Sequence, residues 1–274
     1  MGEWTGYAKL EVAKQNGRTI IVPGKFHYGS FKVTHPLYLD DDCQATLYLL
    51  STGGGYVNGD AYRLELHARE GSIVSLRNQG ATKIYRTIDT PPIQENRMFL
   101  EKGSFASFIP EPTILYKDAR FYQKTEISME KGATLFLAEI LTPGWSPDGE
   151  FFSYKEYRSE VKIFYEGQMA VLDRLRLLPE EDFSRIGYLD SYTHYGSLFV
   201  ISDSLHSDMK EIIKKSLEAQ KSFAKIGISA LPYIEGVCIR ILANNTGIVE
   251  EIITSVYKLL QNTLKQIQTV QRIG

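Results

Sequence analysis

Cysteine, blocks of positive charge and long apolar runs are all scarce in this chain. Its two cysteines, Cys43 and Cys238, lie far apart and form no C-x-x-C pair, which is typical of buried thiols in a reducing compartment. No apolar run approaches the roughly 20 residues of a membrane helix. A net charge of −2 without a basic block argues against nucleic acid and membrane partners. The first residues lack the basic and apolar regions of a signal peptide, so we expect a cytoplasmic protein.

Motifs for catalysis, nucleotide binding and tight metal binding are also missing. The glycine-rich run 53–60 is not followed by Gly-Lys-Ser/Thr, and a strand rather than a helix is expected after it. These features exclude a phosphate loop and a Rossmann fingerprint. The chain has no G-x-S-x-G elbow, and its five histidines form no H-E-x-x-H or H-x-x-E-H pattern. We therefore expect neither an enzyme nor a tightly bound cofactor.

Short β-prone runs fill the chain up to about residue 178. The 17 tyrosines and 13 phenylalanines favour pleated strands, and residues 62–68 alternate apolar with polar, as in a half-buried strand. A weak repeat recurs roughly every 30 residues. Its copies are Glu70-Gly71-Ser72, Lys102-Gly103-Ser104, Lys131-Gly132-Ala133 and Glu166-Gly167-Gln168.

Each repeat glycine separates two expected strands, which suits a hairpin turn with positive φ. A strand–glycine–strand unit repeated four times predicts a mainly β fold of stacked, β-helix-like antiparallel layers. An alternative stays open, because a charged residue followed by glycine and a small residue is common hairpin chemistry without any repeat.

The pattern changes near residue 186. Two amphipathic helices are expected, and their apolar stripes are more typical of a core that covers a sheet than of a partner surface. The C-terminal part is thus a β-α-β-β-α segment, with strands expected at 198–201, 226–231 and 236–242 and helices at 205–223 and 246–270. We expect one domain over 1–274, with a β-rich body at 1–185 and this segment at 186–274.

Two polar runs are candidates for a partner-binding surface. Three successive glycines are poorly explained by a turn alone, although a tight turn in which backbone packs on backbone remains an alternative. In the second run a lysine and an arginine suit a partner carboxylate, and a tyrosine suits an anchor in a partner pocket. A polar strand edge in water is the alternative there. The candidates are Gly53, Gly54, Gly55, Gln79, Lys83, Tyr85 and Arg86.

Several blocks together resemble the UreD family of urease accessory proteins, over most of residues 4–200. The most recognisable is Gln79-Gly80-Ala81-Thr82-Lys83-Ile84-Tyr85. The others are Trp4-Thr5-Gly6, Gly53-Gly54-Gly55-x-x-x-Gly59-Asp60, Pro110-Glu111-Pro112, Leu141-Thr142-Pro143-Gly144-Trp145, Ile186-Gly187-Tyr188 and Ser191-Tyr192-Thr193-His194-Tyr195-Gly196. One departure is Pro143-Gly144-Trp145, where many relatives carry Gly-Arg, so a partner contact by that arginine is in doubt here.

The resemblance implies a largely β fold of helical winding with two helices, and a non-catalytic scaffold role in metallocentre assembly. It implies a complex with a UreF-like accessory protein and a UreG-like GTPase on the urease apoprotein, in which the GTPase uses GTP. Nickel would pass through transiently, and the relay candidates are Asp60, Glu111, Glu139 and His194. From the residues alone, Asp60 is either a turn residue that bonds its own backbone or an acid lining a polar passage.

A second function class stays open on the sequence. A β-solenoid also suits a carbohydrate-active enzyme or a carbohydrate-binding module. Glu111, Glu139 and Glu150 lie near expected strand ends, where two carboxylates at working distance would serve a glycosidase.

Overall fold

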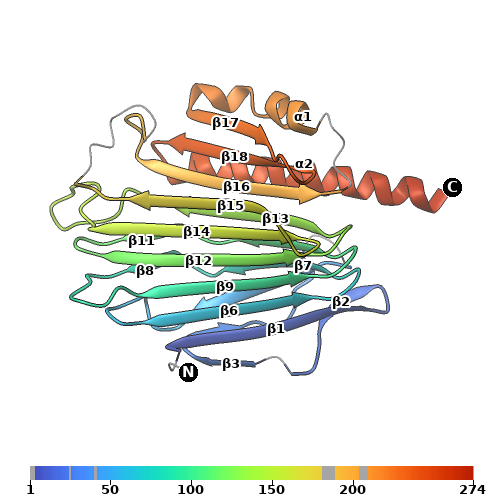
Figure 1. Cartoon of the computed structure of the whole chain (residues 1–274), viewed down its shortest axis with the longest axis horizontal. Helices are drawn as coiled ribbons and strands as arrows, with labels where there is room; N and C mark the ends of the chain where they lie inside the picture. The colour runs from blue at the N-terminus through green and yellow to red at the C-terminus, as the bar shows by residue number, and fades with distance from the viewer. Residues whose placement is uncertain (1–3, 25, 40–41, 181–188, 204–208, 274) are drawn as a thin grey trace.

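Two large β-sheets face each other and form a flattened coil (Figure 1). The computed structural model describes residues 4–24, 26–39, 42–180, 189–203 and 209–273. The expected boundary at 185–186 and the Ile186-Gly187-Tyr188 block lie outside these residues. The first sheet runs in the order β15-β14-β12-β9-β6-β1-β2, with β3 paired to β1. Its strands are β1 (Gly6–Gln15), β2 (Arg18–Ile21), β3 (Phe26–Gly29), β6 (Ala61–Ala68), β9 (Ile93–Leu100), β12 (Arg120–Met129), β14 (Glu156–Tyr165) and β15 (Gln168–Leu177).

The second sheet runs in the order β17-β18-β16-β13-β10-β7-β5-β4. A short row of two parallel strands, β8 and β11, joins it beside β13. The strands are β4 (Phe31–Val33), β5 (Ala45–Ser51), β7 (Ile73–Asn78), β8 (Thr82–Ile84), β10 (Phe105–Ile109), β11 (Thr113–Leu115), β13 (Thr134–Leu141), β16 (His194–Ser202), β17 (Ala224–Ala230) and β18 (Gly236–Ala243).

The mainly β, stacked architecture is confirmed, but the expected antiparallel direction is wrong for the body of the coil. In the first sheet β1, β6, β9, β12 and β14 are parallel, and in the second sheet β5, β7, β10 and β13 are parallel. Antiparallel pairs lie toward the two ends, as in β1–β2, β4–β5, β14–β15 and β13–β16. The body is therefore a β-solenoid.

The repeat glycines explain this difference. All four have positive φ, as expected. However, Gly71, Gly103 and Gly132 carry the chain from a strand of the first sheet to a strand of the second. Each repeat therefore completes one turn of the coil, and equivalent strands stack in parallel. Gly167 does close a hairpin, between β14 and β15.

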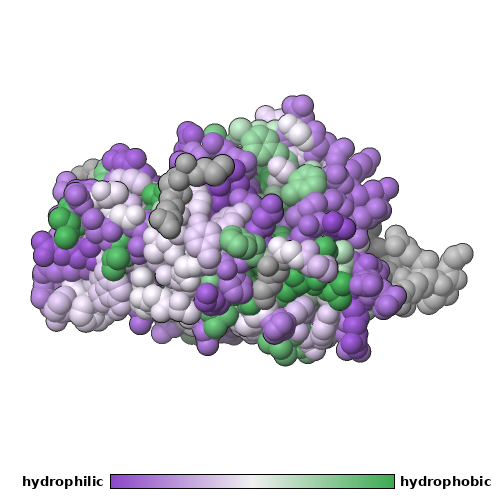
Figure 2. Space-filling model, turned by 90° about the horizontal axis from the view of Figure 1, so that it is seen from below, coloured by the Kyte–Doolittle hydropathy of each residue, from purple (hydrophilic) through white to green (hydrophobic). Residues whose placement is uncertain are grey.

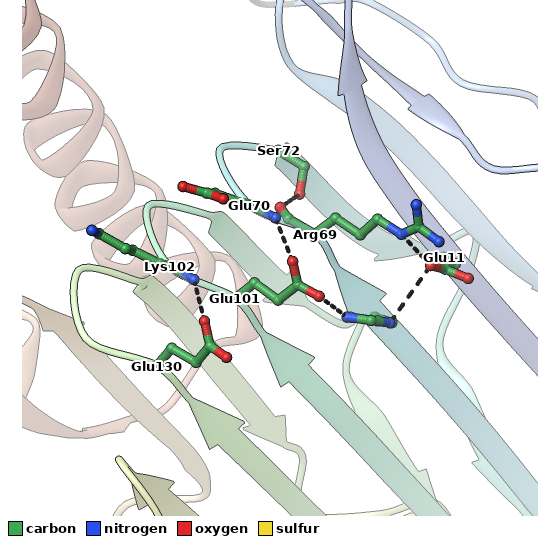
Figure 3. Close-up of polar contacts among 8 residues, drawn as sticks. Glu11, Arg69, Glu70, Ser72, Glu101, Lys102 and Glu130 are labelled. Atoms are coloured by element: carbon green, nitrogen blue, oxygen red, sulfur yellow. Dashed lines mark hydrogen bonds and ion pairs between the residues drawn. The ribbon is translucent and has the colours of Figure 1, made fainter.

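A ladder of carboxylates ties successive glycine turns together (Figure 3). Each carboxylate accepts a hydrogen bond from a backbone N–H of the preceding turn, so neighbouring coils are bonded at this edge. The pairs are Glu101 Oε2 with Glu70 N (2.9 Å), Glu130 Oε2 with Lys102 N (2.9 Å) and Glu166 Oε1 with Lys131 N (2.6 Å). His67 Nε2 lies 2.6 Å from Glu101 Oε1, and its other ring nitrogen lies 3.7 Å from Glu11.

Helices cover the outer face of the second sheet and not its inner face. These are α1 (Met209–Ser216), the short 3-10 helix η1 (Ala219–Ser222) and α2 (Thr246–Ile273). One apolar cluster fills the space between the sheets, and a second, with Phe136, Ile239 and Val256, lies between the second sheet and the helices. Of the helix expected at 205–223, residues 205–208 lie outside the described part of the chain, and the remainder is interrupted between α1 and η1. The expected core role is confirmed for most described residues of the two stripes, whereas Ile212 is exposed. The C-terminal end of α2 projects beyond the sheets (Figure 1).

The first coil is closed by antiparallel strands. β2 and β3 pair with β1, and β4 pairs with β5. Exposed apolar side chains in this part of the chain include Phe26, Leu37 and Leu39. Figure 2 views the molecule from this side and shows several separate hydrophobic patches among hydrophilic residues.

Candidate functional site

The glycine loop and the run 79–86 lie side by side at one edge of the coil. The backbone N–H of Tyr56 donates to Lys83 O (2.7 Å), and the N–H of Tyr85 donates to Tyr56 O (2.9 Å). The Tyr85 hydroxyl donates to Gly54 O (3.2 Å). A Cβ at Gly55 would lie 2.5 Å from the Tyr85 ring and 2.8 Å from Lys83 O. Gly55 is therefore required by close packing, whereas Gly53 and Gly54 are exposed.

A surface groove of about 320 Å³ opens between these two runs. Its lining includes Gly54, Gly55, Gln79 and Lys83, which are four of the partner-binding candidates, together with Asn78. Gln79 and Lys83 are exposed. The sequence runs are thus brought together in one concave surface.

A row of aromatic rings continues from the groove across the coils. The rings of Tyr85 and Tyr116 are 4.8 Å apart, and those of Tyr116 and Trp145 are also 4.8 Å apart. Trp145, part of the Pro143-Gly144-Trp145 departure, is 50% exposed. Arg86 lies next to this row and approaches Asp118 at 3.9 Å. The edge therefore presents a row of mutually tilted aromatic rings beside exposed cations.

Asp60 lies directly behind the glycine loop, and its carboxylate has three hydrogen-bond donors. They are the backbone N–H of Val57 (2.8 Å), the hydroxyl of Thr5 (3.0 Å) and the hydroxyl of Tyr62 (3.1 Å). The bond to Val57 is the local turn contact expected of an Asp at this position. Tyr62 stacks on Tyr56 with ring centres 3.7 Å apart, so Asp60 supports the tyrosine pair at the edge of the interior.

Polar side chains cross the interior from this tyrosine pair. The Tyr56 hydroxyl donates to Gln94 (2.8 Å), Gln94 donates to Asn96 (2.9 Å), and Asn96 donates to Thr125 (3.1 Å). All lie between the two sheets, in an interior that is otherwise filled by an apolar cluster rich in leucine and phenylalanine. We define the polar layer as Tyr56, Asn78, Gln94, Asn96, Gln123, Thr125, Glu139, Ser159 and Ser197.

An internal cavity of about 20 Å³ lies within the polar layer. Such a volume accepts about one water molecule when polar partners are present. Asn78 and Thr82 line both this cavity and the surface groove. The side-chain oxygen of Asn78 is buried and has no hydrogen-bond partner in the described part of the chain. The groove and the interior are therefore adjacent across these two residues.

Glu139 is the buried acid of the polar layer. It projects from β13 toward β14, where the hydroxyls of Tyr157 and Ser159 donate to its carboxylate. Burial raises the pKa of the Glu139 carboxyl, although these two donors and Arg240 oppose the rise. Burial and the nearby carboxylate in turn raise the pKa of Tyr157, which keeps its proton. Glu139 is thus an acceptor-rich group in an interior of low dielectric.

The other two relay candidates lie apart from this layer. Glu111 is exposed, and its charge adds to the effect of burial in raising the pKa of Glu250. His194 is half-buried at the start of β16, where its Nδ1 lies 2.8 Å from the Thr193 hydroxyl. Burial lowers the pKa of His194. Among the described residues, no hydrogen bond or ion pair joins either of them to the polar layer.

Glycosidase and metal-site geometries find no support in the described ranges. Glu139 is buried between the sheets, whereas Glu111 and Glu150 are exposed, so these acids form no paired site. In that same part of the chain, no group of three or more His, Cys, Asp or Glu residues is arranged to hold a metal ion. No described helix is both long and apolar enough to cross a membrane.

Sequence reasoning named Glu139 but missed the groups that surround it. Gln94, Asn96 and Ser159 occupy inward positions of alternating strands, where apolar residues are the rule. A polar residue at two successive inward positions, as in Gln94 and Asn96, was the available signal. This pattern can be recognised in the sequence only when it is known which residues of each strand face the interior.

The fold and the site define a β-solenoid with a polar layer through its core and a groove over one end of that layer. A family model described as UreD urease accessory protein matches residues 5–274. The urease accessory protein UreD of Lachnoclostridium phytofermentans is 36% identical, over 95% of both chains. Those of Bacillus sp. strain TB-90 and Staphylococcus epidermidis are 36% and 34% identical, over 95% of this chain and 95% and 94% of theirs. The chain belongs to the UreD family of urease accessory proteins.

Proposed function

We propose that this chain is a non-catalytic scaffold that passes nickel into apo-urease, in a cytoplasmic complex with a UreF-like protein and a UreG-like GTPase. The names of its relatives support a role in urease maturation. The sequence lacks a phosphate loop, which fits a division of labour in which the GTPase partner uses GTP. Nickel is then the cargo of the complex and not a resident cofactor.

The polar layer is the observation that carries this proposal. A hydrophobic core excludes ions because an isolated charge is costly to bury, whereas this core offers amide, hydroxyl and carboxylate oxygens in sequence. Oxygen ligands hold a late divalent transition ion less tightly than imidazole and thiolate do. A row of such ligands suits the transfer of a cation better than its storage.

The residues have distinct roles in this proposal. Asn78 lines the groove, where its amide oxygen accepts the cation. The carboxylate of Asp60 lies behind the stacked pair Tyr56 and Tyr62 and attracts the cation toward this end of the layer. Glu139 is the acid that stabilises the cation within the layer. The exposed Lys83 and the aromatic row that begins at Tyr85 form a docking edge, because aromatic anchors and cations beside them are enriched at interface hot spots.

Co-purification tests the scaffold role. The tagged chain is expressed with its UreF-like and UreG-like partners and apo-urease, and the proteins retained on the tag are identified together with the nickel content of the urease. We expect a retained complex and urease that gains nickel only when the chain is present. A chain that retains none of these proteins, while urease still fills with nickel, contradicts the proposal.

Variants of the docking edge refine this test. Tyr85→Ala and Lys83→Glu should weaken the complex, because they remove an anchor and reverse a charge at one edge. Lys9→Glu is the control: Lys9 is an exposed lysine on β1 that does not line the groove. Equal retention of all three variants places the interface elsewhere.

A further inference from the structure

Arg240 is a cation placed in the otherwise acidic and neutral polar interior. It projects from β18, and its guanidinium pairs with Asp173 on β15 at 2.7 Å. It also donates to the hydroxyl of Ser197 on β16 and lies over the ring of Phe199, 5.1 Å from the ring centre. Three contacts from three directions hold the planar group, a geometry that suits arginine and not lysine.

Strand register places Arg240 at the end of the polar layer. In the second sheet Glu139 lies opposite Ser197, and Ser197 lies opposite Arg240. Directly paired residues project to the same face, so these three side chains form one inward row. The next position in the row is Gly227 on β17, where a Cβ would meet nothing within 4 Å. Arg240 is therefore the last side chain of the row before open space.

The first sheet ends at the same place. β15 is its terminal strand, whereas the second sheet continues through β18 and β17 (Figure 1). Asp173 is thus the last inward acid on one wall, and it faces Arg240 on the other. Both side chains are partly exposed, at 26% and 32%. Their ion pair spans the gap between the sheets where the interior meets solvent.

We propose that Arg240, held by Asp173 and Ser197, is the barrier that closes this end of the polar layer to cations. The identity of the cation as nickel rests on the proposed function, whereas the barrier is formed by residues of this chain alone and can be tested without a partner. A cation that leaves Glu139 along the row meets the guanidinium, which repels it and occupies the carboxylate it would otherwise reach. Passage requires the Arg240–Asp173 pair to separate, and Arg240 therefore determines when the cargo leaves.

Cys238 provides a reporter of this barrier. It lies two positions before Arg240 on β18, so its side chain is on the same face, and it is half-buried. In a Cys43→Ser background it is the one remaining thiol, because the chain has two cysteines. The probes are a cationic and an anionic methanethiosulfonate of similar size. The ratio of their labelling rates does not depend on the thiol pKa, which affects both reagents equally.

The variants separate the effect of the positive charge of Arg240 from the effect of its ion pair with Asp173. Arg240→Gln should raise the cation-to-anion ratio by about tenfold, because removing a unit charge near the thiol acts on the two reagents in opposite directions. Asp173→Asn should raise both rates without raising the ratio, because it releases the guanidinium but keeps its charge. Arg174→Gln is the control, since Arg174 pairs with Glu160 and is 65% exposed. Unchanged rates and ratio in Arg240→Gln and Asp173→Asn overturn the proposal.

Nickel transfer in the purified complex is the second measurement. Removal of a barrier should raise the initial transfer rate to urease in Arg240→Gln, by at least about twofold, whereas loss of a merely structural contact should lower it. Arg240→Lys keeps the charge and should preserve the labelling ratio if folding is intact. An unchanged or lower transfer rate in Arg240→Gln overturns the barrier while the proposed function stands, provided the parent complex transfers nickel. If the parent complex transfers none, the proposed function fails, and labelling alone decides whether Arg240 closes the layer.

Discussion

Replacing Asp60 by Ala and by Asn should separate its contribution to stability from its charge. The carboxylate uses Oδ1 for the Thr5 hydroxyl and Oδ2 for the Val57 N–H and the Tyr62 hydroxyl. At about 1 kcal/mol for each hydrogen bond, Asp60→Ala should cost about 2–3 kcal/mol of unfolding free energy. For a chain of this size the melting temperature should fall by roughly 4–6 °C.

Asp60→Asn should cost less than about 1 kcal/mol. Its single side-chain oxygen can still accept from Val57 and Tyr62, while its amide group faces the Thr5 hydroxyl. That hydroxyl already accepts from the N–H of Ala61 (3.1 Å), and its second lone pair can accept from the new amide. The geometry of the turn is thus compatible with Asn, and only the negative charge is lost.

Urea unfolding of the purified variants measures the first effect, and the nickel content of urease matured with each variant measures the second. If Asp60 relays a cation, both variants should lower the nickel content although the Asn variant folds and retains its partners. If Asn is as destabilising as Ala, the hydrogen-bond argument is wrong. If the Asn variant matures urease normally, Asp60 is a turn residue and not part of the relay.

Three further predictions concern the loop, the turn ladder and metal affinity. Gly55→Ala should cost about 2–4 kcal/mol of unfolding free energy in urea, because its Cβ would overlap the Tyr85 ring. In Gly54→Ala the added Cβ meets no atom within 4 Å, so that variant should cost only about 1 kcal/mol, from backbone strain. Equal costs for the two variants refute the packing argument. Burial alone would raise the pKa of Glu101, but the Glu70 N–H and His67 bring it below its usual value of 4.5, so its stabilisation is present above pH 4.5 and lost as the pH falls below it. Glu101→Gln should therefore flatten the acid limb of a stability–pH curve, and an unchanged limb contradicts this. Calorimetry of the isolated chain with nickel should show weak binding at one or more sites, and one saturable nanomolar site would contradict a relay.

The sequence predicted the local elements better than their pairing. The strands at 198–201, 226–231 and 236–242 and the long helix from 246 were visible because each has a strong period and clear turn residues at its ends. The direction of stacking was missed, because a glycine with positive φ is compatible with a hairpin and with a turn between two sheets. The two cases differ only in which strand the strand after the glycine pairs with, and that pairing depends on residues far away in the sequence.

The candidate site shows the same limit. The groove joins the glycine loop to the run at 79–86, which were both recognised as unusual, but nothing local shows that Tyr56 pairs with Lys83. Glu139 was named from its place near a strand end. Its donors Tyr157 and Ser159 come from the opposite sheet, so their contact depends on how the two sheets face each other.

The nickel content of urease matured with Glu139→Gln tests the central claim most directly. Glu126→Gln is the matched control, because Glu126 is exposed on β12 and is not part of the polar layer. With both variants retained in the complex, the account predicts that Glu139→Gln lowers the initial rate of nickel incorporation by about tenfold or more, the range typical for loss of a metal-directing group. Incorporation at the parent rate in Glu139→Gln would contradict a passage through this layer.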